Sequence, residues 1–214
     1  KQIPKAKSLT AVQVAKMIEQ GHVVVDGRSS AEFGAGHIPG AINVQLSSGE
    51  FEQRVGWMTP DDAPLILLTN TAAEAQEAIY KMAFIALDSR VAGFLDGGLE
   101  AWLDAGHPLE TVAQMDVHTL HHKLSVNGLQ VLDVRDSEEW EEGHIDRAHF
   151  LPYTRMVDQI TSPAQLHTLN INTDLHVAVT CATGKRSSTA ISIMKREGVK
   201  HLYNVTGGME AWEH

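Results

Sequence analysis

Short apolar runs alternate along the whole chain with longer segments in which apolar residues recur at helical spacing. The apolar runs predict strands at residues 23–26, 41–44, 64–69 and 91–95, and again at 131–134, 149–151, 176–180 and 201–205. The amphipathic segments predict helices at residues 8–20, 72–87, 99–105, 119–127 and 187–197, with Ser8 as the cap of the first helix. Short strands separated by helices are typical of parallel sheets, because a parallel crossover needs a long connection. We therefore expect an α/β fold in which helices cover both faces of each parallel sheet.

Three motifs occur in both halves of the chain, in the same order and at nearly constant spacing. They are VVDGR at 24–28 and VLDVR at 131–135, GHI at 36–38 and 143–145, and LDGGLEAW at 95–102 and VTGGMEAW at 205–212. Such an ordered repeat indicates a tandem duplication of one domain-sized unit. We expect one domain at residues 1–110 and a second at 111–214, with the joint near Pro108.

The composition narrows the possible partners and the compartment. The formal net charge of −10 argues against nucleic acid or an anionic membrane as a partner, and no apolar run is long enough to cross a bilayer. The single cysteine excludes an internal disulfide and fits a reducing compartment, so we expect a cytoplasmic protein. The chain starts at Lys1 without a signal-like apolar stretch or a methionine, so we expect a processed product or part of a longer protein.

The single cysteine lies between a predicted strand and a predicted helix of the second copy. In parallel α/β sheets, ligands bind beyond the carboxyl ends of the strands, where this loop falls. Backbone N–H groups of a short loop and of a helix N-terminus attract anions. Gly184 can adopt backbone conformations closed to other residues, and Lys185 and Arg186 add positive charge. These features favour the thiolate of Cys181 over the thiol and would hold a negatively charged group attached to its sulfur.

Four segments of the second copy together resemble the rhodanese family of sulfurtransferases. They are DVR at 133–135, EWEEGHI at 139–145, the loop 181–186 and GGMEAW at 207–212. The chain is similar to a tandem rhodanese, which implies two rhodanese-like domains. The resemblance implies that Cys181 attacks the outer sulfur of a small anionic donor, thiosulfate or glutathione persulfide, and becomes a persulfide. A thiol or cyanide acceptor then takes this sulfur, and no cofactor is implied.

The resemblance also assigns roles around the cysteine. The substrate-binding positions are those that directly follow it, namely Ala182, Thr183, Gly184, Lys185, Arg186 and Ser187. Arg186 is expected to help bind the anionic donor. Asp133 and Arg135 are expected to support the site: Asp133 either orients loop N–H groups or pairs with an arginine, and Arg135 either forms a salt bridge or contacts the substrate.

The first copy has no cysteine at the matching position. Asn70 stands at the end of its strand, and residues 71–77 contain no glycine or cation but do contain Glu74 and Glu77. An amide cannot form a persulfide, and an acidic loop repels an anionic donor. We therefore expect the first copy to be catalytically inactive. His37 and His144 recur in both copies, which favours a role in the fold.

Segments 51–60 and 91–98 look like the inactive rhodanese copy in fusions with a metallo-β-lactamase-fold domain. Such fusions are similar to persulfide dioxygenases, and the metal-binding domain would precede Lys1. Its His-x-His-x-Asp-His ligand motif is absent from this sequence. The histidine group of His118, His121 and His122 fits a solvated helix start, so we expect no metal in this chain.

Two other functions are consistent with the sequence. The second copy could relay sulfur to or from the fused metal domain without turning over by itself. Dual-specificity phosphatases of the cell-cycle type share the fold and also attack from a loop cysteine. Their loop is one residue longer, so the shorter loop 181–186 should fit a tetrahedral phosphate poorly.

Overall fold

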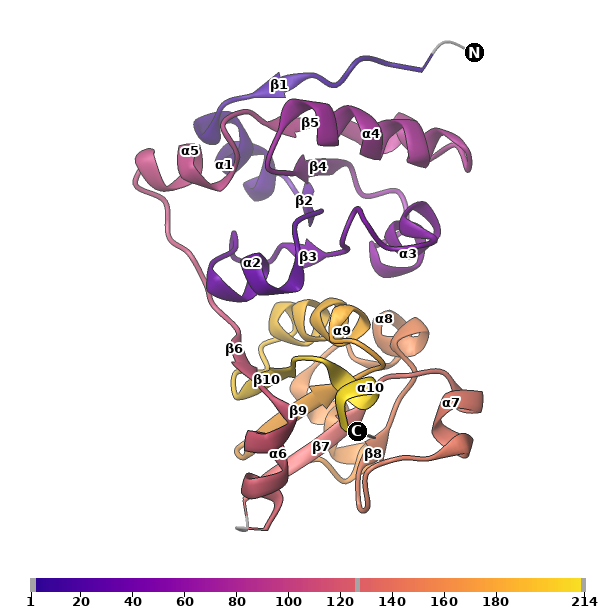
Figure 1. Cartoon of the computed structure of the whole chain (residues 1–214). Helices are drawn as coiled ribbons and strands as arrows, with labels where there is room; N and C mark the ends of the chain where they lie inside the picture. The colour runs from indigo at the N-terminus through magenta and orange to yellow at the C-terminus, as the bar shows by residue number, and fades with distance from the viewer. Residues whose placement is uncertain (1–2, 126–127, 213–214) are drawn as a thin grey trace. The chain divides into compact units, whose positions relative to one another are not determined.

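The computed structural model of the protein describes residues 3–125 and 128–212. The chain divides into two compact units, Lys1–Thr111 (unit 1) and Val112–His214 (unit 2). Within the described residues each unit forms a five-stranded sheet in which all neighbouring strands are parallel, with helices packed around it (Figure 1). The α/β fold expected from the sequence is therefore confirmed.

The sheet of unit 1 has the strand order β1-β5-β4-β2-β3. Its strands are β1 (Ser8–Leu9), β2 (Val23–Asp26), β3 (Ile42–Asn43), β4 (Leu65–Leu68) and β5 (Val91–Leu95). Every residue of β2 and β4 is buried, as expected for continuous apolar strands covered on both faces. Strand β1 was not predicted, because a strand of two residues is too short to show a repeating pattern.

The helices of unit 1 begin and end at local signals that correct two predictions. They are α1 (Ala11–Glu19), α2 (Ser30–Ala35), α3 (Phe51–Met58), α4 (Ala72–Ala83), α5 (Gly98–Asp104) and the 3₁₀ turn η1 (Leu87–Arg90). The prediction that Ser8 caps the first helix is wrong, because Ser8 lies in β1 and donates its hydroxyl to Asp96. Thr10 is the cap, and its side chain accepts from the N–H of Gln13. The helix predicted at 72–87 ends early, since Ala86 takes a left-handed conformation ahead of η1.

The sheet of unit 2 repeats this arrangement with the order β6-β10-β9-β7-β8. Its strands are β6 (Ala113–Met115), β7 (Leu129–Asp133), β8 (His149–Phe150), β9 (His176–Thr180) and β10 (Leu202–Val205). Strand β9 is central and pairs with β7 on one side and β10 on the other. Each strand of unit 2 therefore takes the place of its counterpart in unit 1, which is what a duplicated unit requires.

The two helices predicted in unit 2 both start two residues earlier than expected, at Val117 and at Lys185. The helical segments of this unit are α6 (Val117–Leu124), α7 (Ser137–Glu142), η2 (Tyr153–Arg155), α8 (Met156–Gln159), η3 (Pro163–Leu169), α9 (Lys185–Arg196) and α10 (Gly208–Trp212). Helix α6 starts before the predicted residue 119, because the Asp116 side chain accepts from the N–H of Thr119 and caps it. The predicted end of this helix at residues 126 and 127 lies outside the described residues.

The side chains of β9 alternate between two covered faces of the sheet. Ala178 packs in a buried cluster with Leu120 of α6 and Met209 of α10. Its neighbours Val177 and Val179 point to the opposite face, because successive strand residues alternate. On that face α9 packs against β9 and β10 (Figure 1). The carboxyl end of β9 is thus held rigidly between two helical layers, and Cys181 follows directly after it.

Candidate active site

The loop after β9 turns into α9 at Gly184. This glycine has a φ of 94°, in the left-handed region that the sequence led us to expect. A Cβ atom at this position would also approach the carbonyl oxygen of Val205 to 3.1 Å. Helix α9 begins at Lys185, before the predicted Ser187, so the loop between strand and helix is shorter than the sequence suggested. The tight turn brings the start of the helix back to the cysteine.

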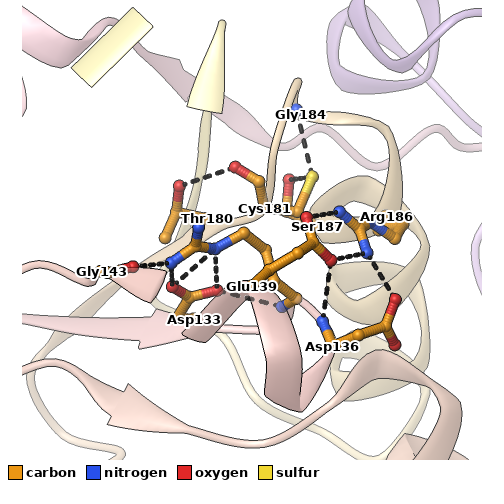
Figure 2. Close-up of polar contacts among 10 residues, drawn as sticks. Asp133, Asp136, Glu139, Gly143, Thr180, Cys181, Gly184, Arg186 and Ser187 are labelled. Carbon is orange, nitrogen blue, oxygen red and sulfur yellow. Dashed lines mark hydrogen bonds and ion pairs between the residues drawn. The ribbon is translucent and has the colours of Figure 1, made fainter. Parts of the chain in front are cut away.

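The Cys181 sulfur is buried and has two polar neighbours (Figure 2). The N–H of Gly184 donates to Sγ at 3.1 Å, and the hydroxyl oxygen of Ser187 lies 3.5 Å from it. A buried cysteine that served only as a small hydrophobic residue would need neither contact. The sulfur therefore faces the polar side of the loop rather than the apolar core.

The loop keeps this orientation because its carbonyl groups are bound on the other side. The N–H groups of Met209 and Glu210, at the start of α10, donate to the carbonyls of Cys181 and Ala182 at 2.8 and 3.0 Å. In a trans peptide the N–H points opposite to the C=O, so the N–H groups that follow these two carbonyls point away from α10. Gly208 permits this close approach, since a Cβ atom there would clash with both carbonyl oxygens.

The first turn of α9 supplies further donors. Among the described residues no side chain caps this helix at Gly184, so the N–H groups of Lys185, Arg186 and Ser187 lack the usual side-chain acceptor. The positive end of the helix dipole adds to them, and together they form a site suited to an anion. Thr183 and Lys185 are exposed, Ala182 is partly buried and Ser187 is buried.

The guanidinium of Arg186 is occupied by two acidic side chains of the α7 segment (Figure 2). It makes a two-pronged contact with Glu139, with both N···O distances at 2.6 Å, and also donates to Asp136 at 2.9 Å. The hydrogen bonds from Arg186 hold the pKa of Glu139 below its ordinary value. Burial acts to lower the pKa of Arg186, but the Glu139 contacts overcome this and raise it above its ordinary value. Arg186 thus joins α9 to α7, and its charge is largely neutralised before any donor binds.

Asp133 and Arg135 form a buried ion pair beside the loop. Both carboxylate oxygens of Asp133 accept from Arg135, with the shortest contact at 2.7 Å, and Arg135 also donates to the carbonyl of Gly143 at 2.6 Å. Of the two roles predicted for Asp133, the structure shows the pairing with an arginine. Asp26 and Arg28 make the same pair in unit 1. A contact present in both units indicates a role in the fold.

The repeated histidines also have the same environment in both units. His144 stacks on Trp140 with ring centroids 3.7 Å apart, and His37 stacks on Phe33 at 3.8 Å. In each case ring atom Nδ1 contacts the carbonyl oxygen of the same aromatic residue. These contacts support the predicted role of the histidines in the fold.

The corresponding loop of unit 1 is built differently. The prediction that Asn70 matches Cys181 is wrong, because the strand registers pair Asp26 with Leu68 and Asp133 with Thr180, so that Thr69 is the counterpart of Cys181. Thr69 is buried, and the exposed Asn70 that follows it donates its side-chain amide to Glu32 at 2.9 Å. The Glu74 carboxylate accepts from the backbone N–H groups of Asn70 and Thr71. A carboxylate therefore accepts from two backbone N–H groups of this loop, and Thr71 caps α4 where Gly184 stands before α9. Thr69 stands where unit 2 has Cys181.

Three residues at the loop were not predicted from the sequence as part of the site. Gly208 leaves room for α10 to approach the loop carbonyls, Glu139 binds Arg186, and Asn204 of β10 accepts from the Ser187 hydroxyl at 2.5 Å. The repeated Gly-Gly pair and the single asparagine within the buried strand β10 were the available signals. Neither signal shows what a residue contacts, because the contacts join segments far apart in the sequence.

In the described part of the chain, the arrangement of the histidines and the one cysteine bears on metal binding. There, no group of three or more histidine, cysteine or acidic side chains is arranged to hold a metal ion. His121 instead lies near the Trp212 ring, with centroids 5.6 Å apart. None of the helices within residues 3–125 and 128–212 combines the length and apolar character that crossing a membrane requires.

Comparison with known proteins identifies the family. The family described as "Rhodanese-like domain" matches residues 10–105 and again 116–214. The chain belongs to the rhodanese-like family, with two copies of its domain. One relative is the mitochondrial protein HIGH ARSENIC CONTENT 1 of Arabidopsis thaliana, 34% identical over 49% of this chain and 63% of that protein. Another is the thiosulfate sulfurtransferase GlpE of Pseudomonas paraeruginosa, 29% identical over 42% of this chain and 74% of that protein.

The rhodanese-like copies resemble parts of longer proteins as well. The chain spans 63% of the Arabidopsis protein and 51% of a putative sulfur carrier protein, YrkF, of Bacillus subtilis. Among solved structures, a thiosulfate sulfurtransferase from Pseudomonas aeruginosa aligns with 92% of this chain and 43% of its own, at 19% identity and a TM-score of 0.44. Among the sequence relatives, those named GlpE are thiosulfate sulfurtransferases.

Proposed function

We propose that the protein is a sulfurtransferase that carries sulfur as a persulfide on Cys181. The Cys181 thiolate attacks the outer sulfur of the donor, a new S–S bond forms, and the bond joining that sulfur to the donor breaks. The leaving group, sulfite or a glutathione thiolate, departs with the electron pair of that bond. An acceptor thiol or cyanide then attacks the transferred sulfur, and the thiolate of Cys181 is released again. The sequence uses only the nucleophile and needs no cofactor.

The observation that carries this proposal is the hydrogen bond from the Gly184 N–H to Sγ at the start of α9. A persulfide places negative charge one bond beyond Sγ, and the first-turn N–H groups of the helix provide donors for charge in that region. The same N–H groups would also bind the negatively charged sulfur donor. We therefore assign the loop from Ala182 to Ser187 to substrate binding and Cys181 to nucleophilic catalysis.

The donor that we propose is a small anion, thiosulfate or glutathione persulfide. Backbone N–H groups and the exposed Lys185 support an anionic donor. Arg186, which is neutralised by Glu139 and Asp136, contributes less charge than the sequence suggested. Its role in this proposal is to hold the loop against α7, with donor contact left to the N–H groups.

The test is the mass of the protein after incubation with thiosulfate or glutathione persulfide. We expect one added sulfur atom on Cys181, its loss on addition of cyanide or a thiol, and no addition in the variant Cys181→Ser. Since the chain has one cysteine, the added sulfur has one possible thiol carrier. A wild-type protein that never gains sulfur, or a C181S variant with undiminished turnover, would show the proposal to be wrong.

Three finer predictions from the sequence are proposals with tests of their own. The first is a fused metallo-β-lactamase-fold domain, to or from which unit 2 would relay sulfur. It rests on segments 51–60 and 91–98 and is tested by the coding sequence upstream of Lys1. A cytoplasmic location rests on the single cysteine and is tested by fractionation. Phosphatase activity is the least supported function, because the Cys181–Arg186 loop has the shorter form, and an aryl phosphate assay tests it.

A further inference from the structure

A buried chain of polar side chains leads away from the Cys181 sulfur. The Ser187 oxygen lies 3.5 Å from Sγ and 2.5 Å from the Oδ1 atom of Asn204. The Nδ2 atom of Asn204 donates to Gln114 Oε1 at 3.0 Å and to the carbonyl oxygen of Gly184 at 3.2 Å. Ser187 and Asn204 are both almost completely buried. Because buried polar groups are hydrogen-bonded, each donor and acceptor in this series of side chains can be assigned.

Two backbone carbonyls fix which end of each amide side chain donates a hydrogen bond. A carbonyl can only accept, so the Asn204 face toward the Gly184 carbonyl must be Nδ2, and Oδ1 must face Ser187. Gln114 is oriented in the same way, because its Nε2 donates to the carbonyl of Val112 at 3.1 Å. The one hydroxyl proton of Ser187 is therefore directed to Asn204. What the hydroxyl offers to Sγ is a lone pair, which can accept from a thiol S–H.

We infer that Asn204 is a positioning residue that competes with the Cys181 sulfur for the hydroxyl proton of Ser187. In the resting protein the proton goes to Asn204, and the hydroxyl accepts from the thiol. When Sγ is ionised or carries a second sulfur, the hydroxyl must turn to donate to it and give up Asn204. This inference rests on the proposed function for its purpose, which is to give the sulfur a further donor when negative charge forms on it. The contacts themselves do not depend on sulfur transfer.

The experiment compares two substitutions at Asn204, of which the aspartate also adds a negative charge, so the deciding comparison is the Asn204→Ala change with and without Ser187. Asn204→Ala and Asn204→Asp both lose the donors to Gly184 and Gln114, but only the aspartate keeps an acceptor for Ser187. The reduced proteins are treated with iodoacetamide at neutral pH and the alkylation of Cys181 is followed by mass. The ultraviolet absorbance of the thiolate is recorded in parallel, because it does not depend on reagent access. Arg186 with its partners Glu139 and Asp136, and the exposed Lys185, are unchanged in every variant.

We expect N204A to be alkylated faster than wild type, because the freed hydroxyl can donate to the thiolate. A hydrogen bond to a charged group corresponds to a change of about tenfold or more in rate. N204D should be no faster than wild type. In a Ser187→Ala background the step from Asn204 to Ala should change the rate less than about twofold, since no hydroxyl remains to be redirected.

Equal changes in N204A and N204D, or an N204A effect that persists without Ser187, would show that Asn204 only holds the loop in place. The single variant S187A gives an independent answer if N204A does not fold. It should change the alkylation rate by less than about tenfold, because the loss of Asn204 offsets most of what the hydroxyl gives the thiolate, and a loss of about tenfold or more would mean that the hydroxyl donates to the sulfur without competition. If the wild-type protein gains no sulfur from any donor, the proposed function fails, while the alkylation rates still decide this inference.

Discussion

Single backbone groups around Cys181 matter more than its charged neighbours. The N–H of Gly184 donates to the sulfur. The carbonyls of Cys181 and Ala182 accept from N–H groups of α10 and therefore point away from the sulfur. Arg186, the residue whose charge the sequence emphasised, is taken up by Glu139 and Asp136. The chemistry of the loop therefore depends on where small residues allow the backbone to go.

Gly208→Ala tests this dependence, with Gly98→Ala in unit 1 as the matched control. Both glycines have positive φ, so both variants pay the same left-handed backbone cost of about 1–2 kcal/mol. Only at Gly208 would the new Cβ also lie 2.5 Å from Ala182 O, within the active loop. We expect G208A to lose additional stability and most persulfide formation, and G98A to keep its persulfide yield, as measured by denaturant unfolding and mass. Equal sulfur loading in the two variants would contradict the anchoring role.

At the scale of elements, α7 and α9 are joined by an ion pair between segments far apart in the sequence. Glu139 and Arg186 come from different motifs, and their two short contacts hold the helix that carries the loop. In unit 1 the counterpart, Glu32, contacts Asn70 instead. The same helix thus supports two different loops through one carboxylate.

The variant Glu139→Gln gives this contact a pH signature. The pKa of Glu139 is lowered from the ordinary value of 4.5, mainly by hydrogen bonds from Arg186. Its stabilising contribution is therefore fully present above about pH 4.5 and is lost as the pH falls through the lowered pKa. We expect wild type to unfold at higher denaturant concentration than E139Q near neutral pH. The difference should shrink as the pH falls below 4.5 and through the lowered pKa of Glu139, because protonation removes the charge that the glutamine lacks. A difference independent of pH would mean that the carboxylate charge contributes nothing.

The whole molecule contains two copies of one fold, and unit 2 carries the cysteine and the loop on which the proposed chemistry depends. The sheets have the same strand order, and the buried Asp–Arg pair and the stacked histidine recur in both. The loops differ in the nucleophile, in the glycine cap and in the acidic residues that occupy the donors. The duplication therefore preserved the scaffold and changed the site.

Thr69→Cys in a Cys181→Ser background tests whether a cysteine alone restores the site of unit 1. We expect no persulfide from thiosulfate, since Glu74 already accepts from the N–H groups of residues 70 and 71 and repels an anion. Alkylation of the new cysteine after unfolding would show that its thiol is reduced, and the wild-type protein is the positive control. Persulfide formation at position 69 at the wild-type level would show that the loop of unit 2 is not needed.

The sequence by itself determined the duplication, the α/β fold and the position of the single cysteine after a strand. Periodic apolar runs, repeated motifs and a single cysteine after a strand are local features, and local features can be read along a chain. The β1 strand, the start of α9 and the Thr10 cap were missed or misplaced, since short elements carry little periodic signal and neighbouring polar residues compete as caps.

Only the tertiary structure decided which groups surround the sulfur. Gly208, Asn204 and Glu139 reach the loop from other elements, and their hydrogen bonds depend on the registers of β9 with β7 and β10. Those contacts set the direction of each loop carbonyl, of the Ser187 proton and of the Arg186 charge. Sequence spacing cannot supply them, because a hydrogen bond depends on distance and angle between segments that the fold alone brings together.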